Sequence, residues 1–143
     1  MASTPTRAIN LAQHLVAVRL AIPDARGRIK RGQLDCIVPI QPTPASQTYS
    51  ARMQYTHWTP PHVHIVEPTL ALHPGATHLP HVYSGNELCL YFPGEWQHGM
   101  LLATTIVPWT AEWLLHYEIW LATGEWTGGG YHPTRADRAS RFG

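Results

Sequence analysis

The sequence predicts a single domain of the α+β class. Its 143 residues suffice for one hydrophobic core. Apolar residues recur with helical spacing near the N-terminus and again between Pro108 and Gly124. Between these two stretches, three runs alternate apolar and polar side chains, which is typical of half-buried strands. We expect residues 1–143 to form one domain with its core between about residues 5 and 126.

The first helix is predicted to begin with Thr4 as its cap and Pro5 in its first turn. Its apolar face carries Ala8, Leu11, Leu15 and Val18. Pro23 ends this pattern. Residues 24–32 are basic and contain glycine, so we expect them to form a solvated connection.

Three strands are predicted to follow in an antiparallel meander. Their alternating apolar positions are Leu34, Cys36, Val38 and Ile40 in the first, Tyr49, Ala51, Met53 and Tyr55 in the second, and Val63 and Ile65 in the third. The first two runs predict a β-hairpin, and Cys36 is expected to face the core. The third run comes after the Pro60-Pro61 step and is expected to be the last strand.

Residues 67–91 are rich in proline and glycine and show little periodicity, which favours a long ordered loop. The second helix is expected from Pro108 to Gly124. Its aromatic stripe should pack on the sheet and comprises Trp109, Trp113, Tyr117 and Trp120. Residues 133–143 are polar, so we expect a flexible tail there.

Composition narrows the classes of function. Lysine and arginine number 10 against 9 aspartate and glutamate, without the basic excess of a nucleic-acid binder. With 44% hydrophobic residues, 13% charged residues and 6 tryptophans, protein partners are expected, and a homodimer is left open. Neither a signal peptide nor a membrane-length apolar stretch is visible, so a cytoplasmic location is expected. There Cys36 and Cys89 should be free thiols.

Two local motifs point toward a function. The step Pro60-Pro61-His62-Val63 leads into the third strand, and Leu88-Cys89-Leu90 follows His81 with Trp96 seven residues after the cysteine. Together with the predicted element order, these motifs resemble ubiquitin-conjugating enzymes. Three further features are the His-x-Tyr before Leu-Cys-Leu-Tyr, the Thr-Ile-Val-Pro-Trp helix start and the Gly-Gly-Gly-x-His-Pro run. They are similar to the bacterial ubiquitin-conjugating-like (E2-like) proteins of CBASS antiphage operons.

This resemblance implies that Cys89 is the nucleophile of a transferase. It would hold the C-terminus of a partner protein as a thioester and pass it to an amine. The partner implied is the cyclic-nucleotide synthase (CD-NTase) of the operon, and neither nucleic acid, membrane nor cofactor is implied. Either a separate protein adenylates the donor, or the cysteine attacks an existing amide.

The resemblance also suggests roles for residues around Cys89. His81 matches the histidine of the His-Pro-Asn triplet in eukaryotic members, as an acid/base or a loop-shaping residue. The asparagine of that triplet is absent, because Val82 and Tyr83 follow His81. Tyr83 and Asn86 are the candidates to donate a hydrogen bond to the oxyanion in its place. Trp96 is expected to brace the loop.

Two alternatives remain open at this point. Cys89 could be a buried structural cysteine, which would make the chain a non-catalytic binding or scaffold module of the same fold. A zinc site is a further alternative, because imidazole is a good zinc ligand. The histidines that motivate it are His62, His64, His73, His78 and His81.

Overall fold

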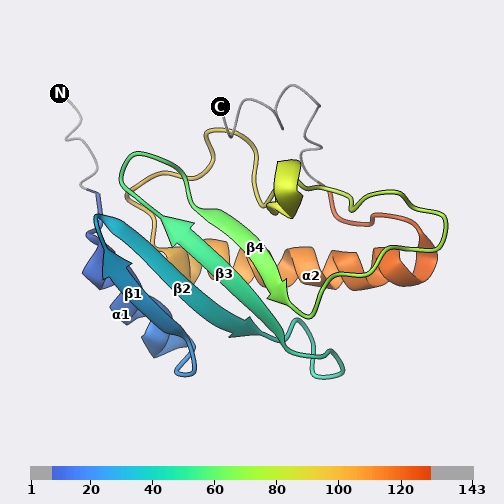
Figure 1. The fold of residues 1–143 in the computed structure, drawn as a ribbon, viewed down its shortest axis with the longest axis horizontal. Coiled ribbons are helices and arrows are strands. Elements are labelled where there is room, and N and C mark those ends of the chain that lie inside the picture. Colours follow the sequence, from blue (N-terminus) through green and yellow to red (C-terminus); the bar gives the residue numbers. More distant parts are fainter. Residues whose placement is uncertain (1–7, 130–143) are drawn as a thin grey trace.

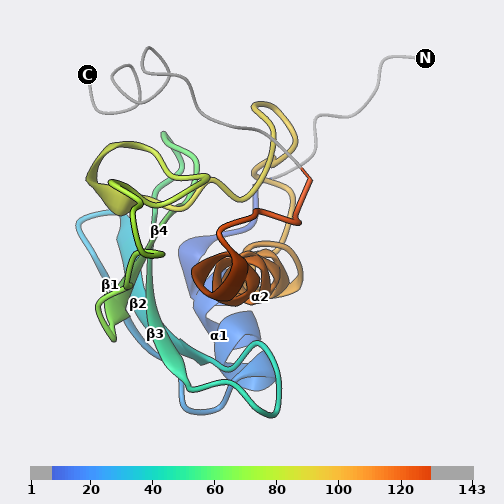
Figure 2. The same ribbon diagram turned by 90° about the vertical axis from the view of Figure 1, so that its right-hand side faces the viewer.

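The computed structural model describes residues 8–129 and confirms the α+β class. A four-stranded antiparallel sheet in the order β1-β2-β3-β4 lies against two helices (Figure 1). Figure 2 shows both helices on the same face of the curved sheet. The elements in chain order are α1 (Leu11–Ala21), β1 (Arg26–Lys30), β2 (Gln33–Ile40), β3 (Tyr49–Tyr55), β4 (His62–Glu67), the 3₁₀ turns η1 (Ser84–Asn86) and η2 (Leu102–Thr104), and α2 (Ile106–Thr123).

The strand β1 corrects the prediction of a solvated connection at residues 24–32 and of a sheet with three strands. All five residues of β1 are exposed. The strand therefore has no buried face, and its sequence shows no alternation of apolar and polar residues. The strand exists because it pairs with β2, from Arg26 opposite Ile37 to Lys30 opposite Gln33. A charged, exposed strand is a common solution at the edge of a sheet.

The first helix begins later than predicted. Asn10 caps it: its side chain accepts a hydrogen bond from the Gln13 backbone N–H at 2.8 Å, and the Gln13 side chain accepts from the Asn10 N–H at 3.2 Å. This reciprocal capping box satisfies two backbone donors that an unfinished helix end leaves unpaired. Ala8 therefore precedes the helix, while the predicted cap at Thr4 lies outside the described residues.

The second helix matches its predicted end. Gly124 adopts a left-handed conformation with φ of 81°, and its N–H donates to the Trp120 carbonyl at 2.7 Å. The helix starts at Ile106, so Pro108 lies in the first turn, where its missing N–H costs no helical hydrogen bond. Within residues 8–129, no helix combines the length and apolarity needed to cross a bilayer.

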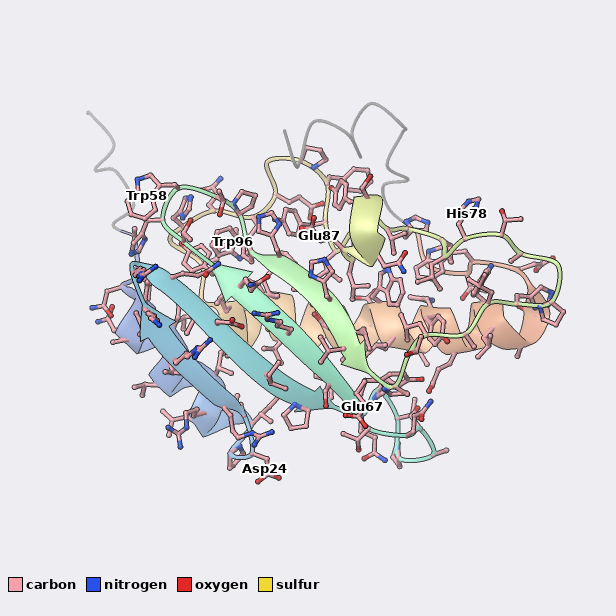
Figure 3. All side chains as sticks on the ribbon, viewed as in Figure 1. Asp24, Trp58, Glu67, His78, Glu87 and Trp96 are labelled. Atoms are coloured by element: carbon pink, nitrogen blue, oxygen red, sulfur yellow. The ribbon has the colours of Figure 1, made fainter. Side chains whose placement is uncertain are left out.

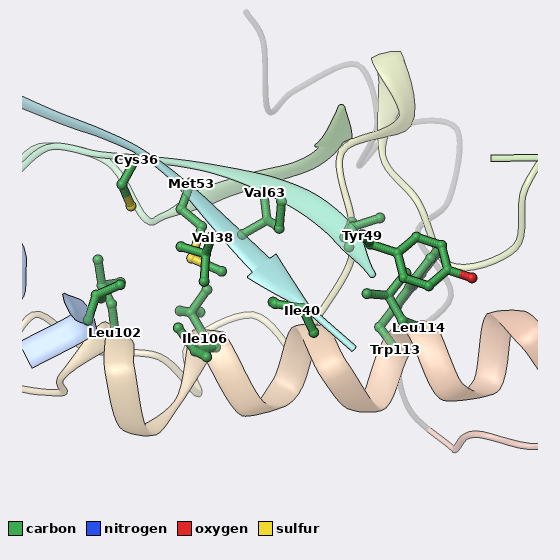
Figure 4. Packing of buried hydrophobic residues seen from close by; sticks show 14 of the residues in the cluster. Cys36, Val38, Ile40, Tyr49, Met53, Val63, Leu102, Ile106, Trp113 and Leu114 are labelled. Carbon is green, nitrogen blue, oxygen red and sulfur yellow. The ribbon is translucent and has the colours of Figure 1, made fainter. Parts of the chain in front are cut away.

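The core lies between the sheet and the helices. Residues of β2 and β3 alternate between buried and partly exposed, as their sequence predicts, and Cys36 is buried. Figure 4 shows side chains of the sheet, among them Val38 and Met53, directed toward α2. Trp113, Tyr117 and Trp120 of the aromatic stripe are buried, which confirms its packing role, whereas Trp109 is only partly buried at the core's margin.

The stretch 67–91 is largely irregular, and it makes contacts both within itself and with α2. Its regular features are the single turn η1 and an isolated bridge between Val82 and Leu88. The Tyr117 hydroxyl binds this stretch near its start, where it accepts a hydrogen bond from the Ala71 N–H and donates one to the Ala71 carbonyl. The predicted flexible tail at residues 133–143 lies outside the described residues.

Candidate functional site

The segment from His81 to Cys89 folds back on itself like a short hairpin. The Cys89 N–H donates to the His81 carbonyl at 3.0 Å, and the Tyr83 N–H donates to the Glu87 carbonyl at 2.8 Å. The turn between these pairs needs positive φ angles, which Gly85 supplies at 74° and Asn86 at 61°. The loop therefore presents Cys89 at a defined place.

The Cys89 side chain is nearly buried, with 6% of the residue exposed. Its thiol lies within hydrogen-bonding distance of the Tyr83 hydroxyl, at 3.6 Å, and of the Tyr91 carbonyl, at 3.8 Å. Sulfur forms weak and long hydrogen bonds, so these contacts orient the thiol without strongly restraining it.

A pocket of about 320 Å³ opens beside Cys89. Its walls are the loop after the cysteine, one face of α2 and the segment after α2. The lining residues are His81, Cys89, Leu90, Tyr91, Phe92, Glu95, Trp109, Glu112, Trp113, His116, Trp126, Gly128 and Gly129. The pocket therefore combines one thiol with aromatic walls and two carboxylates.

The close approach of Gly128 to α2 shapes this pocket. A Cβ atom at Gly128 would lie 2.7 Å from Cδ2 of His116 and 2.9 Å from Nε1 of Trp126. Atoms that close must shift, so the small residue allows the segment to lie against the helix. At Gly129, by contrast, an added Cβ atom would have nothing within 4 Å.

His81 lines the pocket together with Cys89. Its backbone carbonyl accepts from the Cys89 N–H and from Nε1 of Trp113, the latter at 3.1 Å. Its ring stacks on Trp126, with centroids 4.6 Å apart and planes inclined by 23°. The backbone of His81 has a positive φ of 50°. Its carbonyl is hydrogen-bonded to the Cys89 backbone, while its ring packs against the segment after α2.

Of the other predicted site residues, Tyr83 contacts the Cys89 thiol. Tyr83 is buried and reaches the thiol, whereas Asn86 is exposed in the turn η1. Trp96 is buried, donates from Nε1 to Oγ1 of Thr105 at 3.1 Å, and packs edge-on against Tyr55. It belongs to the hydrophobic core and is not among the pocket's lining residues.

Sequence reasoning missed Glu87, whose side chain is fully buried. Its Oε1 lies 2.6 Å from Nδ1 of His62 on β4. Figure 3 shows Glu87 beside β4, close to η1. The signal in the sequence was an acidic residue directly before the apolar Leu88-Cys89-Leu90 run, because a carboxylate in such a place needs a partner.

Sequence reasoning also missed the α2 residues that reach the pocket, Glu112 and His116, and the segment that begins at Trp126. Glu112 and His116 are four residues apart and so share a helix face. Trp126 precedes a glycine run, but nothing in the sequence places that segment on the helix.

The histidines proposed for zinc do not gather. His73 contacts the Leu121 carbonyl, His78 is exposed beside Thr77, and His81 stacks on Trp126. Among residues 8–129, no three His, Cys, Asp or Glu side chains are grouped so that they could hold a metal ion.

The second cysteine differs from Cys89 in its surroundings. Cys36 lies on β2, on the face of the sheet that is turned to the core, and only 1% of the residue is exposed. Burial, and then the charge of Asp35, raise the pKa of the Cys36 thiol to about 12. Cys36 therefore stays protonated and unreactive at neutral pH.

Comparison with known protein families gives a match. The model of a family described as "Type II CBASS E2 protein" matches residues 14–133, which is most of the chain and extends from within α1 past α2. No curated protein matches.

Proposed function

The chain belongs to the family of Type II CBASS E2 proteins, and from this premise we propose that Cys89 is the nucleophile of its E2-like reaction. Family membership supports an E2-like role in CBASS antiphage defence, with protein partners within the CBASS operon. In our proposal, Cys89 accepts the C-terminal acyl group of a partner protein and transfers it to an amine. The proposed donor is the CD-NTase of the operon.

One observation carries the proposal: Cys89 borders a pocket large enough for a short peptide segment, whereas Cys36 is enclosed in the core. The aromatic walls suit a short peptide with apolar or glycine residues, and they shield it from water. Phe92 lies at this pocket with 50% of the residue exposed, which offers apolar surface to a protein partner.

The proposed reaction has two steps. In the first, the Cys89 thiolate attacks the terminal carbonyl carbon, a carbon–sulfur bond forms, and the bond to the leaving group breaks. The leaving group is AMP if a separate protein has adenylated the donor, or, if an amide is attacked, an amine that takes up a proton as it leaves. In the second, an acceptor amine attacks the thioester, loses a proton as the new amide forms, and releases the Cys89 thiolate.

Residue roles follow from the contacts. A negative oxygen develops on the carbonyl in both steps and requires a hydrogen-bond donor. We assign this role to the Tyr83 hydroxyl, which lies beside the thiol, instead of the exposed Asn86. His81 holds the Cys89 backbone through its carbonyl and provides an imidazole in the same pocket for proton transfer.

The experiment is intact-protein mass spectrometry after coexpression with the neighbouring CD-NTase. A thioester predicts an adduct equal to the partner's mass less one water if the C-terminus is adenylated, or less the released amine if an amide is attacked, and this adduct is lost on treatment with a thiol. Cys89→Ala should abolish it, Cys89→Ser should give an ester that resists thiols, and Cys36→Ala, the matched control, should retain it. An adduct that persists in Cys89→Ala would contradict the proposal.

A non-catalytic binding module is the second candidate, and the low exposure of Cys89 favours it. In such a module the chain would bind the synthase without forming a bond. Native alkylation separates the two functions, because a structural thiol resists iodoacetamide whereas an activated thiol reacts in minutes. A partner complex without an adduct, together with an inert Cys89, would establish the binding module.

A further inference from the structure

The carboxylate of Glu87 is buried two residues before Cys89. None of its side chain is exposed. A carboxylate removed from water is costly unless a hydrogen-bonding or charged partner compensates it. His62 provides such a partner, because its Nδ1 lies 2.6 Å from Oε1 of Glu87, within hydrogen-bonding distance.

The pair joins the loop that carries Cys89 to the first residue of β4. His62 and Val63 begin β4, the edge strand of the sheet on this side. The neighbouring residues form a second link, since the Leu88 N–H donates to the Val63 carbonyl at 2.9 Å. Two consecutive loop residues are thus attached to two consecutive strand residues, one through side chains and one through the backbone.

The attachment is connected through the backbone to both Tyr83 and Cys89. Glu87 is connected to Tyr83, because the Tyr83 N–H donates to the Glu87 carbonyl, and Cys89 follows two residues later. A shift of Glu87 would therefore move the Tyr83 hydroxyl and the Cys89 thiol together. Misplacement by about 1 Å can slow a reaction about 100-fold.

We propose that His62 and Glu87 are positioning residues, whose hydrogen bond holds the Cys89 loop against β4 so that the thiol and the Tyr83 hydroxyl stay in register. The inference rests on the proposed function, because it concerns the geometry of Cys89 as the nucleophile. Neither residue acts on the substrate directly.

A matched control is offered by His64. It lies two residues after His62 on the same strand and faces Arg52 across the β3–β4 pair. Its removal takes the same side chain from the same strand and breaks no bond between His62 and Glu87, although the charges of Glu87 and His62 also act on His64. His62→Gln is the conservative variant, because glutamine keeps a donor that can reach the carboxylate.

The test measures two rates in the full chain: formation of the CD-NTase adduct and alkylation of Cys89 by iodoacetamide. For His62→Ala we expect adduct formation to fall between about 10- and 100-fold. Alkylation should become several-fold faster, since a released loop exposes the thiol. His62→Gln should recover most of the adduct rate, and His64→Ala should change both rates far less than His62→Ala does.

The opposite movement of the two rates distinguishes positioning from a loss of folding, which a thermal melt checks independently. Wild-type rates in His62→Ala would overturn the inference, as would equal effects of His62→Ala and His64→Ala. A wild type that forms no Cys89 adduct would refute the proposed function instead. Alkylation would still test the pair in that case.

Discussion

The hydroxyl oxygen of Tyr83 lies 3.6 Å from the sulfur of Cys89, and both residues are buried. The fold-back of the loop produces this contact, since the residues are six positions apart and joined by the bridge between Val82 and Leu88. A phenol beside a thiol can donate a hydrogen bond to the thiolate or to an oxyanion formed on it. The hydroxyl group of Tyr83 should therefore matter to the reaction more than to the fold.

Tyr83→Phe should reduce adduct formation by about 100-fold, because it removes one donor aimed at the developing charge. The ring remains, so the free energy of unfolding should fall by no more than about 1.5 kcal/mol. Single-turnover transfer and urea denaturation measure the two quantities. Asn86→Ala is the control and should react like the wild type; if it instead shows the larger defect, the oxyanion donor is Asn86.

Native alkylation at pH 8 should label one of the two cysteines. With a pKa of about 12, only about one Cys36 thiol in ten thousand is ionised at that pH. Peptide mass spectrometry should locate the label on Cys89, and Cys36→Ala should leave its rate unchanged. If Cys36 were labelled as fast as Cys89, the Cys36 thiol on β2 would have to be accessible to the reagent, and this prediction would be wrong.

Gly128→Ala should disturb the pocket, whereas Gly129→Ala should not. The added methyl group at residue 128 would lie 2.7 Å from His116, but nothing lies within 4 Å of the same position at residue 129. We expect a loss of about 1–3 kcal/mol of stability, a change in tryptophan fluorescence as Trp126 leaves His81, and slower adduct formation. Equal behaviour of the two variants would show that the segment does not rest on α2.

Acid should weaken the fold through His14. Burial, and then the nearby His57 and His98, lower the pKa of His14 to about 4, and its Nδ1 accepts from the Leu102 N–H. The unfolded chain, with a histidine pKa of 6.5, binds more protons between these values. Stability is therefore complete above pH 6.5 and falls by on the order of 3 kcal/mol as the pH approaches 4.

Urea denaturation at several pH values checks this dependence. His14→Gln keeps an acceptor for the Leu102 N–H but cannot titrate, so its stability should depend less steeply on pH in this range. The exposed His78 serves as the control, and His78→Gln should follow the wild type. The same slope in wild type and His14→Gln would assign the acid sensitivity to other groups.

Much of the fold could be predicted because it leaves a local pattern. The alternation from Leu34 to Ile40 and from Tyr49 to Tyr55 marks strands with one buried face, and the aromatic stripe up to Gly124 marks α2. The strand β1 could not be recognised in this way, since none of its residues is buried. The start of α1 was misplaced because Thr4 and Asn10 are both suitable caps, and the capping box at Gln13 decides between them.

Patterns among neighbouring residues predict the α+β class, the buried face of the central strands, the end of α2 and the family resemblance. Each of these rests on neighbouring residues, whose spacing reflects helix or strand geometry directly. Tertiary structure alone decided the pairing of β1, the partner of Glu87 and the pocket that joins Cys89 to α2 and Trp126. Those features depend on contacts between residues distant in the chain, such as the 25 positions between His62 and Glu87, and local periodicity carries no record of them.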